Sequence, residues 1–175
     1  MDRRRFTPFP VLTTPRFILR PLTVDDEKEL FILRSDERVN RFLDRPRATS
    51  LEDVRQWLEK IQQGIDKDEA IMWAFELKST PVLMGSICFW KISWEEMSAE
   101  IGYELLPQHH GQGVMQEIIP AVLRYGFEEL KLNSITASIH PENIRSISLV
   151  RNMGFVQEPH PEAHETTDVF FRLCR

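Results

Sequence analysis

The sequence predicts a single α+β domain, residues 1–175, with a mixed, mostly antiparallel central sheet. The chain has 175 residues, of which 42% are apolar, and this is typical of one globular domain with its own core. Apolar residues recur at helical spacing in some segments and alternate or form β-branched runs in others. Short turns join three neighbouring strand candidates, whereas a helical segment joins the next pair, so antiparallel and parallel pairing are both expected. The pattern amounts to about six to seven strands and about four helices.

The N-terminal segment, residues 1–12, contains prolines and is expected to form an extended arm. RFILRPL, residues 16–22, alternates in polarity and predicts a first strand that Pro21 ends. Thr23 precedes a run of acidic residues, which a helix dipole favours at its start. The first helix is therefore predicted over residues 24–34.

A second helix and three strands follow. Ser50, with Asp53 three residues later, resembles a capping box, and apolar residues at helical spacing continue to Ile65. The polar loop between the two helices is expected to be mobile. Runs rich in β-branched and aromatic residues then predict three antiparallel strands, at residues 71–78, 82–92 and 97–106.

The C-terminal half alternates helices with strands. Apolar spacing predicts a helix to about residue 131, with Pro120 inside it, which should kink the helix or shift its start. A β-branched strand is predicted at 134–140, followed by a helix that Gly154 ends as a left-handed cap. The final strand is predicted at 166–173. Because a helix links strands 97–106 and 134–140, these two strands are expected to be parallel.

Composition and charge disfavour several functional classes. The net charge is −5 and the calculated pI is near 5.6, so nothing favours direct binding of nucleic acid or of an anionic membrane. No apolar run approaches the ~20 residues that a membrane-spanning helix needs. Cys88 and Cys174 form neither a disulfide framework nor a zinc motif, which agrees with a reducing compartment. We expect a cytoplasmic protein, and exposed strand edges would allow a homodimer.

The segment LLPQHHGQGVMQE, residues 105–117, carries the clearest chemical signal. Gly111 and Gly113 stand between a predicted strand and a predicted helix, where free backbone N–H groups and the helix dipole bind phosphate. The segment is not a Walker loop, since no Lys or Ser/Thr follows Gly113. Nor is it a dinucleotide fingerprint, since Gln116 stands at the third glycine position. On these residues alone, a phosphate cradle and a plain tight turn both remain open.

The same segment contains two neighbouring histidines, His109 and His110. Helical metal sites use two ligands four residues apart on one face, whereas adjacent side chains point apart. No third ligand lies near them in the sequence, and we expect no metal.

The flanking residues add a family resemblance. Gln108 to Gly113 fits the Q/R-x-x-G-x-G/A loop of the GCN5-related N-acetyltransferases (GNAT), and NIRSISLVRNMGF about thirty residues later resembles the second helix motif of that family. AEIGYELLPQHHGQGVMQE, together with RFILRPL, is most similar to the branch that acetylates the N-termini of ribosomal proteins. The resemblance covers about residues 13–173. It implies a GNAT-like sheet that is splayed between strands 97–106 and 134–140.

The resemblance also implies acetyl-CoA as co-substrate, bound in that splay. The pantetheine arm would pair with the strand at Leu105 and Leu106, and Asn143 would contact the cofactor. The pyrophosphate would lie on the glycine loop, to which the resemblance assigns Gln108, Gly111, Gln112, Gly113, Val114 and Met115. Glycine suits such a loop, because a Cβ would obstruct the approach of phosphate to the backbone.

The catalytic residues are implied less directly. Many members have a Tyr as the acid seven residues after the motif Asn, and Val150 stands there in this chain. In the ribosomal branch a Ser three residues after the Asn approaches the sulfur, which matches Ser146. For the base, Glu100 is the first candidate and Glu104 the second, and strand alternation places both on one face. Glu162 or Glu165 in the late loop is a third route. Each carboxylate could equally be an ordinary solvated or paired group.

The function implied is direct transfer of an acetyl group from acetyl-CoA to a primary amine. A protein N-terminal α-amine is one acceptor, and a small-molecule amine or antibiotic is the alternative. The Val150 substitution favours a different alternative, a catalytically impaired acyl-CoA-binding module. If the chain binds no cofactor, the remaining interpretation is a plain α+β interaction domain.

Overall fold

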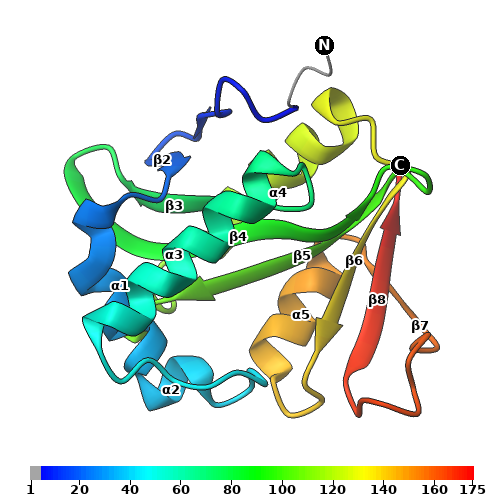
Figure 1. The fold of residues 1–175 in the computed structure, drawn as a ribbon. Helices are drawn as coiled ribbons and strands as arrows, with labels where there is room; N and C mark the ends of the chain where they lie inside the picture. The colour runs from blue at the N-terminus through cyan, green and yellow to red at the C-terminus, as the bar shows by residue number, and fades with distance from the viewer. Residues whose placement is uncertain (1–4) are drawn as a thin grey trace.

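The computed structural model describes residues 5–175 and contains one eight-stranded sheet in the order β1-β2-β3-β4-β5-β6-β8-β7 (Figure 1). The predicted α+β class with a mixed, mostly antiparallel sheet is confirmed. The strands are β1 Leu12–Thr13, β2 Phe17–Pro21, β3 Ile71–Leu77, β4 Thr80–Ser93, β5 Ser98–Leu105, β6 Ser134–Ile139, β7 Val156–Glu158 and β8 Val169–Cys174. The count exceeds the expected six to seven because β1 and β7 are too short to show a polarity pattern.

The helices are α1 Glu27–Ser35, α2 Glu37–Asn40, α3 Leu51–Asp66, α4 Val114–Arg124 and α5 Ile144–Asn152. A 3₁₀ turn, Val24–Asp26, precedes α1, and the Asp26 carboxylate accepts from the N–H of Thr23 at 2.9 Å. The predicted capping box of α3 is present, since Ser50 and Asp53 satisfy each other's N–H groups. No helix within residues 5–175 is long and apolar enough to cross a membrane.

Three further helical features bear on the sequence predictions. Pro120 lies inside α4, which begins at Val114 directly after the glycines, so the helix start is not shifted. A π-helical segment, Tyr125–Glu129, continues α4 towards the predicted end. The short helix α2 was not predicted. It leads into a loop that is anchored, because Ala48 N–H donates to the Arg34 carbonyl at 3.1 Å.

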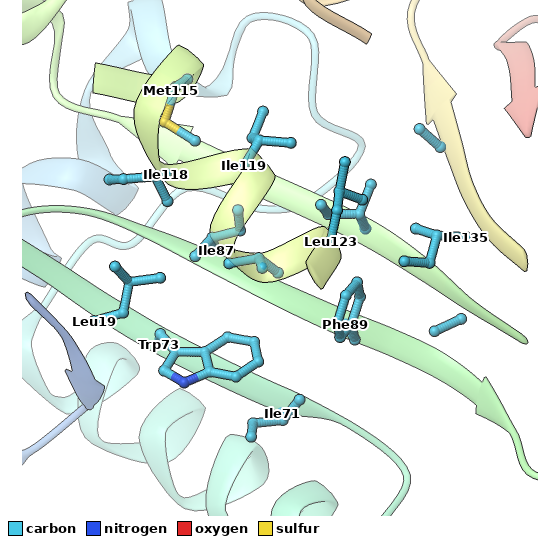
Figure 2. Close-up of a cluster of buried hydrophobic side chains, with 14 of the residues drawn as sticks. Leu19, Ile71, Trp73, Ile87, Phe89, Met115, Ile118, Ile119, Leu123 and Ile135 are labelled. Carbon is cyan, nitrogen blue, oxygen red and sulfur yellow. The ribbon is translucent and has the colours of Figure 1, made fainter. Parts of the chain in front are cut away.

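The sheet has an apolar core on each face because successive strand residues point to opposite sides. Figure 2 shows Met115, Ile118, Ile119 and Leu123 of α4 packed over β3 and β4. The larger core on this face also includes residues of α5. α1 and α3 cover the other face, against Ala74 of β3.

The N-terminal arm was predicted over residues 1–12, of which residues 1–4 lie outside the described part of the chain. The remaining residues pack against the domain. Phe6 is 3% exposed, and the Pro10 carbonyl accepts from Trp73 Nε1 at 2.7 Å. Leu12 and Thr13 then pair with β2 and extend the sheet by one short strand.

Helix α5 ends as its sequence predicts. Gly154 has φ +91°, a left-handed conformation that strains residues with a Cβ. Gly154 N–H donates to the Arg151 carbonyl at 3.0 Å, and Phe155 N–H donates to the Val150 carbonyl at 3.1 Å. These two bonds form a Schellman motif, which satisfies carbonyls at the helix end.

The central feature for function is the separation of β5 and β6. These strands pair in parallel over three positions only, Ser98 with Ser134, Ala99 with Ile135 and Glu100 with Thr136. Beyond them β5 continues to Leu105 and β6 to Ile139, and the two strands diverge (Figure 1). The predicted splay between these strands is therefore present.

Candidate functional site

The backbone of β5 directs some of its N–H groups away from β4 where it leaves β6. Alternate residues of a strand direct their N–H and C=O groups to the same neighbour. The N–H of Leu106 donates to the Met84 carbonyl at 3.0 Å, so even-numbered residues of β5 pair with β4. Tyr103 and Leu105 therefore direct their N–H groups towards the splay that opens after Glu100. Of the two amides singled out in the sequence, that of Leu105 faces the splay and that of Leu106 is used within the sheet.

The glycine loop, residues 108–113, is shaped for an anion. Gly111 and Gly113 have φ values of +74° and +70°, and Gly113 is the N-cap of α4. None of the backbone N–H groups of residues 111–116 donates to an acceptor within the described chain. Apart from Gly111 and its two chain neighbours, no atom of residues 5–175 lies within 4 Å of the position that a Cβ on Gly111 would take, which leaves that side of the loop open. Free amides at a helix N-terminus fit a phosphate group.

Several side chains that were predicted to bind the cofactor at this end are engaged within the protein. The side chains of Val114 and Met115 are buried in the larger core, with 2% and 7% exposure. Gln112 Nε2 donates to the carbonyl of Gln108 at 3.0 Å, which braces the loop from within. The contact between Gln112 and Gln108 thus stabilises the loop conformation.

His110 joins the glycine loop to two other elements. Its Nε2 lies 3.2 Å from the Leu105 carbonyl, and its Nδ1 lies 3.2 Å from Arg145 Nη1 at the start of α5. Arg145 is a donor, so Nδ1 accepts and Nε2–H donates, which corresponds to a neutral imidazole. Within residues 5–175 no group of three or more His, Cys, Asp or Glu side chains is placed to hold a metal ion.

The start of α5 brings Ser146 to the splay. Asn143 is the N-cap of α5, and its Oδ1 accepts from the Ser146 N–H at 3.3 Å. The Ser146 hydroxyl lies 2.6 Å from the hydroxyl of Tyr103 on β5. Burial raises the pKa of Tyr103 to about 12, so its hydroxyl stays protonated at neutral pH. Val150 is 1% exposed and belongs to the core.

Tyr103 was not singled out in the sequence. It is the only ionisable hydroxyl that the described residues of β5 place on the α4 and α5 face, and it reaches an element 43 residues later. Strand alternation could have indicated its face, because Tyr103 lies opposite to Glu100 and Glu104. Nothing local in the sequence reveals its contact with Ser146.

Glu100 is a buried carboxylate at the point where the strands separate. It is 8% exposed, and its ion-pair partner is Lys91, whose Nζ lies 3.5 Å from Oε2. Burial raises the pKa of Glu100, Lys91 opposes that rise, and the carboxylates of Glu162 and Asp168 add to it. A raised pKa improves a carboxylate as a proton acceptor near neutral pH.

Glu104 shares the face of Glu100, as predicted, but its carboxylate is already bound. Arg45 Nη2 donates to it at 2.5 Å, and the Ser86 hydroxyl donates to its second oxygen at 3.1 Å. Arg45 also donates to Asn40 at the end of α2. This network attaches the loop after α2 to β5, and it leaves Glu104 less suited than Glu100 to accept a proton.

An open cavity of about 540 Å³ lies beside the C-terminal end of β6. We call it the loop cleft; residues 41–44 form one wall, residues 163–168 the other, and His140 lies between them. The rings of His140 and Phe42 are 5.3 Å apart. The cleft is lined by three acidic residues, Asp44, Glu165 and Asp168, and by one arginine, Arg41, so its acidic groups are in excess. Oε1 of Glu165 lies 3.2 Å from Nε2 of His164. The cleft suits a ligand that carries positive charge.

Comparisons with known proteins agree with this geometry. Residues 16–156 match the family model of the acetyltransferase (GNAT) domain. An uncharacterized N-acetyltransferase of Bacillus subtilis, YoaA, is 33% identical over 150 residues, which span 86% of this chain and 85% of that protein. A spermidine N(1)-acetyltransferase of Vibrio cholerae is 32% identical over 78 residues, which span 45% of each chain.

A solved structure shares the fold over nearly the whole chain. It is RimL, a ribosomal L7/L12 alpha-N-protein acetyltransferase in complex with coenzyme A, with a TM-score of 0.84. The match covers 94% of this chain and 98% of that chain, at 19% sequence identity. At this identity the likeness establishes the fold and leaves the acceptor open.

Proposed function

This chain belongs to the GNAT family of N-acetyltransferases, which use acetyl-CoA, and we propose that it acetylates the α-amine of a protein or peptide N-terminus. The observation that carries the proposal is the splay between β5 and β6. Free amides of the glycine loop lie at one end of it, and the buried carboxylate of Glu100 lies at its fork. A phosphate-bearing thioester and an amine can therefore meet between the strands.

Acetyl-CoA would supply the thioester whose acetyl group is transferred. The amides of residues 111–116 would bind its pyrophosphate, and the pantetheine arm would follow the odd-numbered backbone groups of β5. The N–H of Leu105 points into the splay and would donate to the carbonyl oxygen as charge develops on it. Asn143 orders the start of α5 and so places Ser146.

Glu100 would accept the proton of the attacking amine. An α-amine has a reference pKa of about 7.7–8, compared with about 10.4 for lysine, so far more of it is neutral at physiological pH. A carboxylate with a raised pKa is then a sufficient base. Glu104 would instead attach the loop after α2 to β5, since Arg45 and Ser86 already bind its oxygens.

Ser146 and Tyr103 would stabilise the departing thiolate in place of the tyrosine that Val150 replaces. If the Tyr103 O–H donates a hydrogen bond to the Ser146 oxygen, the Ser146 O–H is free to donate a hydrogen bond to sulfur. The high pKa of Tyr103 keeps that proton on the phenol at neutral pH. The pair would therefore act as a hydrogen-bond donor chain.

The experiment that tests this proposal pairs activity with binding. The chain is incubated with acetyl-CoA and peptides that have either a free or a blocked N-terminus and an internal lysine, and thiol release and peptide mass are measured. We expect one acetyl group on free N-termini and none on blocked peptides. Acetylation of the blocked peptides would show that the acceptor is a lysine.

Two alternatives have their own outcomes. The match to a spermidine acetyltransferase and the acidic cleft residues favour a small cationic amine, which the same assay detects with polyamines as acceptors. An impaired acyl-CoA-binding module would bind CoA tightly and acetylate no peptide or amine. Ser146→Ala separates an enzyme from such a module, because it should lower turnover and leave CoA affinity unchanged.

A further inference from the structure

A charged residue next to the N-terminal strands binds backbone carbonyls of the glycine loop. Arg16, directly before β2, donates from Nη1 to the Gln112 carbonyl at 3.1 Å and from Nη2 to the Gly113 carbonyl at 3.2 Å. Its Nε donates to Glu117 of α4 at 2.6 Å. Three of its donors thus bind the loop and the first turn of α4, although about a hundred residues separate them in the sequence.

Glu117 fixes Arg16 in turn. Its carboxylate accepts from the Thr14 hydroxyl at 2.6 Å and from the Arg16 backbone N–H at 2.8 Å, besides Arg16 Nε. Its side chain is 18% exposed, compared with 45% for Arg16. Burial opposes ionisation, but the hydrogen bonds from Thr14 and Arg16 outweigh it and lower the pKa of Glu117. The carboxylate is therefore ionised and paired at neutral pH.

The geometry of the peptide bond links these contacts to the ligand side of the loop. In a planar trans peptide, the carbonyl of one residue and the N–H of the next point in opposite directions. Arg16 binds the carbonyls of Gln112 and Gly113, so the N–H groups of Gly113 and Val114 point away from Arg16. Arg16 also neutralises a carboxylate that would otherwise repel an anion at the start of α4.

We infer that Arg16, held by Glu117 and Thr14, is a positioning residue that orients the Gly113 and Val114 amides for the CoA pyrophosphate. This rests on the proposed acetyl-CoA site. It assigns a binding role to a residue that touches no catalytic candidate. Loss of Arg16 should weaken the binding only of ligands that carry the pyrophosphate.

The test compares CoA with a truncated ligand. Arg16→Ala should raise the Kd of CoA by about tenfold or more, since it removes several charge-assisted hydrogen bonds that order the loop. The ratio of kcat/KM for acetyl-CoA to that for S-acetylpantetheine, which lacks the pyrophosphate, should fall by the same factor. Arg124→Ala, an exposed cation on α4, is the matched control and should change neither quantity by more than about twofold.

A second variant separates positioning from general damage. Glu117→Gln in the Arg16→Ala background removes a carboxylate that has lost its ion-pair partner and should recover part of the CoA affinity. Equal losses with both thioesters, or a CoA Kd within twofold of the native chain, would overturn the assignment. Failure of the native chain to bind CoA would instead refute the proposed function.

Discussion

The two sides of the splay are built in different ways. On the side of the glycine loop, the candidate cofactor-binding groups are backbone amides fixed by left-handed glycines and by helix starts, and the Tyr103 and Ser146 hydroxyls lie on the same side. On the side of the loop cleft, they are carboxylates held or perturbed by partners from other segments, such as Arg45 with Glu104. The amides follow from short stretches of sequence, although the distant Arg16 also holds their loop. The second side depends on contacts that only the folded chain creates.

The largest expected effect tests whether Glu100 is the base of the second side. Glu100→Gln removes a proton acceptor while keeping its size, and kcat should fall by about 10²- to 10⁴-fold. The measurement is steady-state kinetics with the best acceptor peptide. Glu95→Gln, an exposed carboxylate in the turn before β5, is the control and should retain activity. A loss below threefold in the Glu100 variant would move the base elsewhere.

The same carboxylate predicts a pH dependence of stability. Because burial raises the folded-state pKa of Glu100, its contribution to stability is fully present at low pH and is lost as pH rises through that pKa. Glu100→Gln should therefore be more stable than the native chain at neutral pH, and the difference should shrink towards about pH 4. Urea unfolding across that range measures it. A difference that grows at low pH would contradict the direction of the shift.

The next effect tests the opposite side, at the Tyr103 and Ser146 pair. Ser146→Ala should lower kcat by about ten- to a hundredfold, because the thiolate loses its hydrogen-bond donor. Tyr103→Phe should have a smaller effect of the same kind, since Ser146 keeps its own hydroxyl. CoA affinity, measured by calorimetry, should stay within about twofold in both variants. A parallel loss of affinity would mean that the pair shapes the cofactor site instead.

A smaller effect is expected for the network that attaches the loop after α2. Arg45→Gln breaks an ion pair whose side chains are 23% and 8% exposed, and it should cost about 1–3 kcal/mol of stability. The KM for the acceptor should rise, because Arg45 anchors the loop that forms one wall of the cleft. Glu104→Gln and the double variant complete a mutant cycle. Additive losses would show that the pair is not coupled.

What the sequence could predict divides by how far apart the contacting residues lie in the chain. The glycine loop, the cap at Gly154 and the capping box at Ser50 were predicted because each depends on residues within a few positions. Strand alternation likewise placed Glu100 and Glu104 on one face. The contacts of Tyr103 with Ser146 and of Arg16 with Glu117 were missed, because they join segments about 40 and 100 residues apart. No local pattern encodes such partners.

The smallest effect concerns the acidic residues of the loop cleft. Glu165→Gln combined with Asp168→Asn should raise the KM for a cationic acceptor by about two- to fivefold at low ionic strength, because exposed charges attract weakly and are screened by salt. The effect should disappear near 1 M salt, and kcat should fall only slightly, because Asp168 contributes little to the raised pKa of Glu100. Thr167→Ala in the same wall is a neutral control. A fall in kcat by orders of magnitude would place the base in this loop, which the resemblance to the ribosomal branch also allows. Glu100 would then only influence the pKa of that base through its charge.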